Sequence, residues 1–205
     1  MTLRAIAALI VGLGLSACAS TDVVSRNAPI ETAPLSALDG AEIVRDYNVV
    51  AVNVDVPRAL DVSERNGYYP TADIVWRGDP IGDRHVQIEQ IFLTAADQAA
   101  ANLGGARDVT LMIELVRFHG VTERTRYSVG GVYNMEFNMT VLDAETGAVV
   151  EPERFLVADL PAPGGQAAIQ LEQSGQTEKV RVLEYLTFFL HQELSGDAGP
   201  QAPTT

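Results

Sequence analysis

The chain has 205 residues, of which 47% are hydrophobic and 20% are charged, a composition typical of a globular protein. Acidic residues outnumber basic residues by 27 to 14, and the resulting net charge of −13 argues against nucleic acid as a partner, because affinity for phosphate comes from clustered Lys and Arg. A single cysteine excludes an internal disulfide and a zinc site built from several thiolates.

The N-terminus has the pattern of an export signal. Arg4 precedes an apolar run over residues 5–15, which is shorter than the roughly 20 residues of a membrane span. The run ends in the sequence LSAC at residues 15–18, which resembles the lipobox of bacterial lipoproteins. This resemblance implies that Cys18 is acylated and that residues 1–17 are removed. The alternative is an ordinary signal peptide whose cleavage site is formed by the small residues around Cys18.

Lipidation of Cys18 would anchor the protein to a membrane. Each buried CH₂ contributes about 0.8 kcal/mol, so two or three acyl chains such as palmitate hold a protein that one chain would not. Ala19 follows the cysteine, and by resemblance to the enterobacterial sorting rule a residue other than Asp favours the outer membrane. We therefore expect a lipid-anchored protein on the periplasmic face of the outer membrane.

The rest of the chain divides into three parts. Residues 18–46 are small and polar and are expected to form the lipidated N-terminus and a flexible tether. Residues 47–195 contain all the sustained apolar patterns and are expected to form a single domain. Residues 196–205 carry no such pattern and are expected to be a disordered tail.

The first half of this domain predicts a strand, an irregular excursion and a helix. Alternating valines predict a strand over residues 47–56, with Val50 and Val52 on its buried face and Tyr47 on the other. Residues 58–79 are irregular, with a possible short strand at residues 73–76. Apolar residues at helical spacing then predict a helix to Leu103, which Gly104-Gly105 would end with a left-handed cap.

The second half predicts three strands and a helix. Alternation indicates strands over residues 109–118 and 127–142, followed by a hairpin turn that contains Gly147. A returning strand is expected at residues 148–150 and 155–160, broken at Pro152, before a helix from the N-cap Thr177 to Leu194. The order β-α-β-β-β-α predicts an α+β fold, with a mostly antiparallel sheet of about four strands and two helices packed on one face.

Residues 60–84, LDVSERNGYYPTADIVWRGDPIGDR, resemble an uncharacterised family of alphaproteobacterial lipoproteins, and the resemblance continues to about residue 194. The order of elements is also similar to that of small periplasmic lipoproteins that serve transporters or outer-membrane assembly. Neither resemblance supplies catalytic residues to this chain.

Residues 76–85 concentrate side chains able to perform acid–base chemistry. These side chains are Trp76, Arg77, Asp79, Asp83, Arg84 and His85. One hypothesis is an anchored hydrolase that uses Asp79 and Asp83. The favoured interpretation is a helix entry, in which Asp79 or Asp83 caps the helix and the arginines pair with these carboxylates.

Other catalytic and metal-binding patterns are sparse. His85, His119 and His191 lie in different elements and lack metal-ligand spacing, so we expect no metal and no cofactor. No hydrolase motif built on serine or lysine is present. We therefore expect a protein that acts by binding and is not an enzyme, with an auxiliary subunit of an envelope transport or assembly machine as the alternative.

A local excess of positive charge stands out on this acidic chain. Arg117, Arg124 and Arg126 face only Glu123 nearby, and they either contact lipid phosphate or an acidic partner, or are solvated turn charges. Strand parity places Phe118 on the face away from the helices, within an exposed apolar patch that these arginines would border. We expect this patch to bind a protein partner or a second copy, unless the tether or the excursion covers it.

Overall fold

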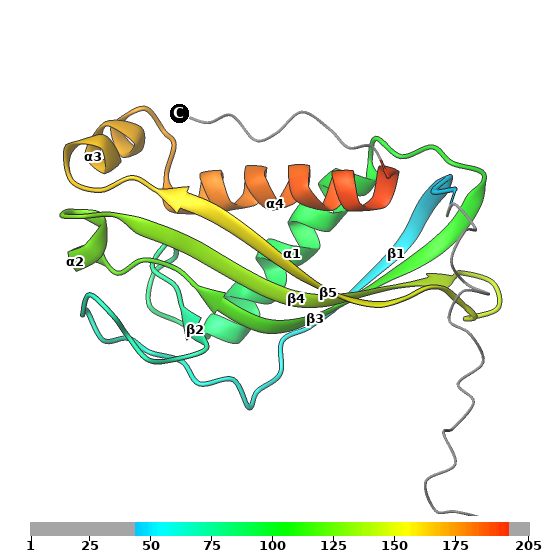
Figure 1. The fold of residues 1–205 in the computed structure, drawn as a ribbon, viewed down its shortest axis with the longest axis horizontal. Coiled ribbons are helices and arrows are strands. Elements are labelled where there is room, and N and C mark those ends of the chain that lie inside the picture. Colours follow the sequence, from blue (N-terminus) through cyan, green and yellow to red (C-terminus); the bar gives the residue numbers. More distant parts are fainter. Residues whose placement is uncertain (1–43, 197–205) are drawn as a thin grey trace, which may run out of the picture. The chain divides into compact units, whose positions relative to one another are not determined.

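Two long helices, two short helices and a mixed β-sheet form the described part of the chain, residues 44–196, in a computed structural model (Figure 1). The predicted signal peptide, the lipidation residue Cys18, most of the predicted tether and residues 197–205 of the predicted tail lie outside the described residues. The expected α+β fold is confirmed.

The larger elements follow the predicted order β-α-β-β-β-α. In chain order the elements are β1 (Tyr47–Asp55), β2 (Ile74–Val75), α1 (Arg84–Ala100), β3 (Arg107–His119), α2 (Glu123–Arg126), β4 (Gly131–Asp143), β5 (Val149–Ala162), α3 (Gln166–Gln173) and α4 (Glu178–Ser195). Helices α2 and α3 were not predicted. The predicted break at Pro152 is wrong, because β5 continues through it while its pairing with β4 shifts register nearby.

The sheet has the order β1-β3-β4-β5, and β2 pairs with the end of β3. Strands β3, β4 and β5 are antiparallel neighbours, as predicted, whereas β1 and β2 run parallel to β3. A parallel pair needs a crossover, and α1 provides it between β1 and β3. The start of β1 therefore lies at one end of the domain, and β2, α2 and α3 lie at the other (Figure 1).

Aromatic rings join α1 and α4 to the same face of the sheet. The ring centroid of Phe137 on β4 lies 5.1 Å from that of Phe92 on α1 and 6.1 Å from that of Phe189 on α4. Phe118 on β3 continues the series, with its centroid 6.3 Å from Phe92 and 5.4 Å from Trp76. These edge-to-face contacts connect the loop after β2 with α4 across the core.

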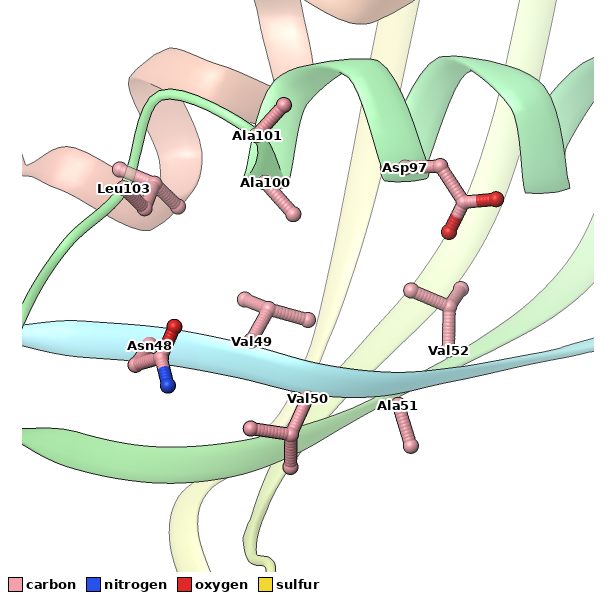
Figure 2. A pocket seen from close by; sticks show the side chains of 9 residues that line it. All are labelled: Asn48, Val49, Val50, Ala51, Val52, Asp97, Ala100, Ala101 and Leu103. Carbon is pink, nitrogen blue, oxygen red and sulfur yellow. The ribbon is translucent and has the colours of Figure 1, made fainter.

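A β-bulge in β1 reverses part of the predicted alternation. The pairing of β1 with β3 shifts between Val49 and Ala51. Figure 2 shows that Val49 and Val52 point toward α1, whereas Val50 and Ala51 point away. Val50 is 52% exposed and Tyr47 is buried, so both predicted positions are wrong. An extra residue on one strand flips every side chain before it to the opposite face.

A second bulge, between Leu115 and Arg117 in β3, has the same consequence. It turns Phe118 into the core, where the side chain is fully buried. The predicted exposed patch around Phe118 is therefore wrong. Arg117 instead takes the outward position and stands opposite Glu136 in the register with β4.

Gly104-Gly105 does not form the predicted left-handed cap. Helix α1 ends at Ala100, and the next residue, Ala101, keeps a right-handed backbone. Gly105 is needed for a close approach instead, because a Cβ there would lie 2.1 Å from the carbonyl carbon of Asp46. Gly147 has a φ of 70°, as the predicted hairpin turn requires.

The corrected position of Phe118 predicts its effect on stability. We expect Phe118→Ala to lower the free energy of unfolding by about 3–5 kcal/mol, because it removes a buried ring and leaves a cavity. Phe155→Ala is the matched control, since this strand phenylalanine is 56% exposed and its loss should change stability by less than about 1 kcal/mol. Urea denaturation measures both, and equal effects would contradict the assignment of faces.

Candidate functional site

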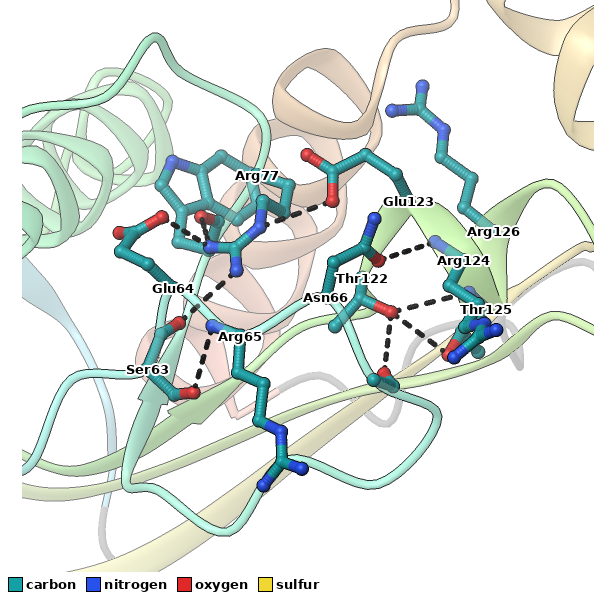
Figure 3. A network of polar contacts seen from close by, with 12 residues as sticks. Ser63, Glu64, Arg65, Asn66, Arg77, Thr122, Glu123, Arg124, Thr125 and Arg126 are labelled. Atoms are coloured by element: carbon teal, nitrogen blue, oxygen red, sulfur yellow. Dashed lines mark hydrogen bonds and ion pairs between the residues drawn. The ribbon is translucent and has the colours of Figure 1, made fainter.

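Residues 76–85, the candidate loop, and the segment around Arg124 and Arg126 meet at the end of the domain that carries β2 and α2. Arg77 joins them, with Nη1 2.9 Å from Glu64 Oε2 and Nε 3.3 Å from Glu123 Oε2 (Figure 3). Its guanidinium also donates to the backbone carbonyls of Trp76 and Ser63. The Arg77 side chain is 5% exposed, so this contact is internal and ties the excursion to α2.

Arg84 is buried at the first residue of α1 despite its charge. Its Nε and Nη2 donate to the two oxygens of Glu64 at 2.7 and 3.2 Å. Its Nη1 donates to the Gln87 side chain and to the carbonyls of Asp79 and Pro80. A buried guanidinium is tolerated when its donors are paired in this way. The hydrogen bond from Arg84 holds the pKa of Glu64 below its usual range.

Asp79 connects the loop after β2 to α4. One carboxylate oxygen accepts a hydrogen bond from Trp76 Nε1 at 2.8 Å, and the other lies 2.6 Å from Lys179 Nζ. The predicted pairing of Asp79 with a neighbouring arginine is therefore replaced by a contact across 100 residues. Asp79 does not cap a helix.

Asp83 is the N-cap of α1. Its side chain accepts a hydrogen bond from the Val86 backbone N–H at 3.3 Å and pairs with Arg58 at 2.7 Å. The hydrogen bond from Arg58, together with the cap, lowers the pKa of Asp83. The capping interpretation is thus confirmed for Asp83, and the two acids of the hydrolase hypothesis have separate structural partners.

Arg126 faces inward and is neutralised by acids of the helices after β5. Its guanidinium lies 3.1 Å from Glu178 and 3.5 Å from Glu172. Glu178 is 3% exposed and also accepts a hydrogen bond from the Tyr133 hydroxyl at 2.8 Å. Burial raises the pKa of Glu178 and that of Tyr133 above their ordinary values. This cluster holds the start of α4 against β4 and α2.

Arg117 and Arg124 are placed differently. The Arg124 guanidinium lies over the Tyr68 ring, 5.1 Å from its centroid. The Arg117 side chain lies on the outer face of the sheet and has no hydrogen-bond or ion-pair partner within residues 44–196. The structure therefore separates the three arginines into different environments instead of forming one basic site.

The three histidines each lie within hydrogen-bond distance of a backbone carbonyl. His85 Nε2 is 3.2 Å from Leu60 O, His119 Nε2 is 2.9 Å from Pro70 O, and His191 Nδ1 is 3.1 Å from Ala99 O. In the part of the chain that the structure describes, no three His, Cys, Asp or Glu side chains are grouped to hold a metal ion. None of the helices described there combines the length and apolarity needed to cross a bilayer.

A shallow hollow lies apart from these groups, between β1 and the C-terminal end of α1 (Figure 2). Its volume is about 290 Å³. Asp97 is the single ionisable side chain of its lining, and the rest is mostly valine, alanine and leucine. This hollow therefore offers no pair of groups for acid–base chemistry.

A buried carboxylate that the sequence did not indicate lies at the opposite end of the domain. Glu151 accepts hydrogen bonds from Arg45 Nε at 2.8 Å and from the Tyr47 hydroxyl at 2.7 Å. Burial raises the pKa of Glu151, but these hydrogen bonds outweigh it and leave a net lowering. Burial and the contact with Glu151 raise the pKa of Tyr47 to about 12. The cluster fixes the entry of the chain into β1.

Sequence reasoning also missed Glu64 and Lys179. Glu64 lies 20 residues before its partner Arg84, in an irregular segment without a periodic pattern. Lys179 is the only lysine of the chain, which is a signal that could have drawn attention to it, but its partner lies in a distant loop.

The contacts of Glu64 predict how its replacement changes the unfolding free energy and the dependence of that energy on pH. We expect Glu64→Ala to cost roughly 3 kcal/mol, because it leaves the buried Arg84 without its carboxylate. A carboxyl with a lowered pKa contributes stability above its unfolded pKa of about 4.3, and this contribution is lost as the pH falls through the folded value. The unfolding free energy of wild type should therefore fall more steeply below about pH 4 than that of Glu64→Gln. Urea denaturation at each pH measures both proteins. If their unfolding free energies fell equally steeply with pH, the role assigned to the Glu64 carboxylate would be wrong.

The capping role of Asp83 predicts how its replacement changes the melting temperature. Asp83→Ala should lower the melting temperature, because the first turn of α1 loses its cap. Asp83→Asn, which also caps helices well, should retain most of the wild-type value although it loses the ion pair with Arg58. Calorimetry on the three proteins tests this, and an unchanged melting temperature in Asp83→Ala would reject the capping role.

Comparison with known proteins identifies the family of the domain. Residues 47–205 match the model of a family of unknown function, DUF6778. The fold is similar to protein XCC0632 from Xanthomonas campestris, of family DUF330, at 13% identity and a TM-score of 0.43, over 77% of this chain and 87% of that chain. It is also similar to a protein from Caulobacter crescentus CB15 described as a "putative lipoprotein", at 16% identity and a TM-score of 0.29, over 76% of this chain and 95% of that chain. No curated protein matches the chain. The chain therefore belongs to the DUF6778 family of unknown function.

Proposed function

We propose that the protein is a periplasmic lipoprotein, anchored in the outer membrane through Cys18, whose α+β domain acts by binding and not by catalysis. The anchor is supported by the apolar run before the sequence LSAC at residues 15–18 and by the use of the chain's only cysteine at this position. The resemblance of residues 60–84 to alphaproteobacterial lipoproteins gives the same indication.

The engagement of the reactive side chains supports binding over catalysis. Asp79 holds an indole and a lysine, and Asp83 caps α1. The histidines contact backbone carbonyls. A hydrolase needs an acid, a base or a nucleophile that faces open space where a substrate can reach it. Here both acids of residues 76–85 already have partners within the domain, and Asp79 is largely covered, which is the observation that carries this part of the proposal.

The anchor would restrict the partners that the domain can meet. Residues 19–43 separate Cys18 from the described domain and span at most about 85 Å when fully extended. Two or three acyl chains keep the protein on the membrane, because each buried CH₂ contributes about 0.8 kcal/mol. A partner must therefore lie in the envelope, within reach of the outer membrane.

Labelling with radioactive palmitate tests the anchor. Wild type and the control Ser16→Ala, which keeps the cysteine, should incorporate label and sediment with outer membranes. Cys18→Ser should incorporate none and leave the membrane fraction, because it lacks the acceptor thiol. Ala19→Asp should keep the label and shift toward the inner membrane if the sorting rule holds. Incorporation of label into Cys18→Ser, or no incorporation into wild type, would contradict the proposal that the protein is a lipoprotein.

A further inference from the structure

The tip of the excursion between β1 and α1, residues 66–70, is fixed by hydrogen bonds to the end of β3 and to residues of α2 and its N-cap. The contacts are Thr122 Oγ1 to Gly67 O at 2.8 Å, Thr125 Oγ1 to Tyr68 O at 3.5 Å, the Arg124 N–H to Asn66 Oδ1 at 2.8 Å and His119 Nε2 to Pro70 O at 2.9 Å. Figure 3 shows Asn66 beside Thr122 and Arg124. The tip therefore has a defined conformation although it contains no helix or strand.

This fixed tip presents two tyrosines to solvent. Tyr69 is 93% exposed, and its hydroxyl has no hydrogen bond within the described chain. Tyr68 is 45% exposed and lies beneath the Arg124 guanidinium. A tyrosine supplies a large amphipathic contact area and has few rotatable bonds to order. Rings held outward on an ordered loop are suited to bind a partner at low entropic cost.

Two arginines of this region lack a carboxylate partner: Arg124, which lies over the Tyr68 ring, and Arg65, three residues before Tyr68 in the same loop. The Arg65 side chain has no hydrogen bond or ion pair among residues 44–196, and Arg124 has no carboxylate partner there. Most other arginines of the domain, among them Arg77 and Arg84, are paired with acids. On a chain with a net charge of −13, these free positive charges mark the surface for a negatively charged ligand. We call the residues Arg65, Tyr68, Tyr69 and Arg124 the distal surface.

We propose that the distal surface docks an acidic segment of a partner protein, whose carboxylates pair with Arg65 and Arg124 while its apolar groups contact Tyr68 and Tyr69. Tyr and Arg are the side chains that most often dominate the energy of protein interfaces, and an arginine can bind a carboxylate in a bidentate manner. This proposal rests on the binding role proposed above and assigns it a site and a class of partner.

Two observations favour a protein over an anionic membrane. An extended anionic membrane would face the whole domain and be repelled by its net charge of −13, whereas a short acidic segment meets only the distal surface and is screened by salt from the rest. The distal surface also lies near His119, the last residue of β3. Arg107, the first residue of β3, pairs with the start of β1 at the other end of the domain. The 13 residues of β3 span about 40 Å, so the site lies about that far from the point where the segment after Cys18 joins the domain.

Photocrosslinking in cells tests the proposal on the full chain. Benzoylphenylalanine replaces Tyr69 at the distal surface or, as a control, Val149, which is 63% exposed at the start of β5. We expect an ultraviolet-dependent protein adduct from position 69 and not from position 149. Mass spectrometry should map it to a segment rich in Asp and Glu.

Charge variants make the test specific. Adding Arg65→Glu should reduce the adduct about tenfold or more, whereas Arg65→Lys should retain most of it. Arg65 is chosen because its side chain makes no polar contact in the described chain, so its replacement leaves the fold intact, which a melting curve verifies. Arg124→Glu provides the second variant and should act in the same direction.

Each other outcome overturns the proposal in a distinguishable way. An adduct unaffected by Arg65→Glu, or mapped to a segment without carboxylates, removes the charge-based assignment. An adduct to lipid would make the distal surface a membrane contact. An adduct from position 149 alone would reject the distal surface and leave the binding role standing. No protein adduct from either position would count against both.

Discussion

Glu64 is the carboxylate on which the far end of the domain depends. It lies in an irregular loop and accepts hydrogen bonds from two almost fully buried arginines, one after β2 and one at the start of α1. Without it the buried Arg84 would have no carboxylate partner, and Arg77 would keep only its pair with Glu123. Because Arg77 also reaches Glu123, the same acid indirectly fixes the position of α2. The excursion between β1 and α1 is therefore an integral part of the domain.

The aromatic core provides the second constraint. The edge-to-face contacts that run from Trp76 through Phe118, Phe92 and Phe137 to Phe189 join a loop, two strands and two helices. Trp76 also carries the polar link, since its indole N–H binds Asp79 and through it Lys179 of α4. The core contacts and the polar contacts thus fix the same loop after β2, although it has no regular structure.

The fold was largely predictable because periodicity is a local property of the sequence. The alternation in β4 and the apolar stripes of α1 and α4 identify these elements, and the caps at Asp83 and Thr177 follow from residue type. The bulges were not predictable, because nothing in the residues Val49–Ala51 or Leu115–Arg117 shows where a strand gains a residue. Each bulge reversed the assigned face of its neighbours, and this is why Phe118 was assigned to the surface. The parallel pairing of β1 with β3 likewise follows from how α1 crosses the sheet and not from β1 itself.

The candidate site was less predictable, because its contacts join residues far apart in sequence. Composition located the charged side chains of residues 76–85, but their roles depend on Glu64, Arg58 and Lys179, which no local pattern connects to them. The same contacts explain why the distal surface differs from the rest of the domain. Where a carboxylate is buried, as in Glu151 and Glu178, an arginine pairs with it. In a chain with nearly twice as many acids as bases, carboxylates are abundant. An arginine that pairs with none of them, as Arg65 and Arg124 do at the distal surface and Arg117 does on the outer face of the sheet, stays available for an external carboxylate.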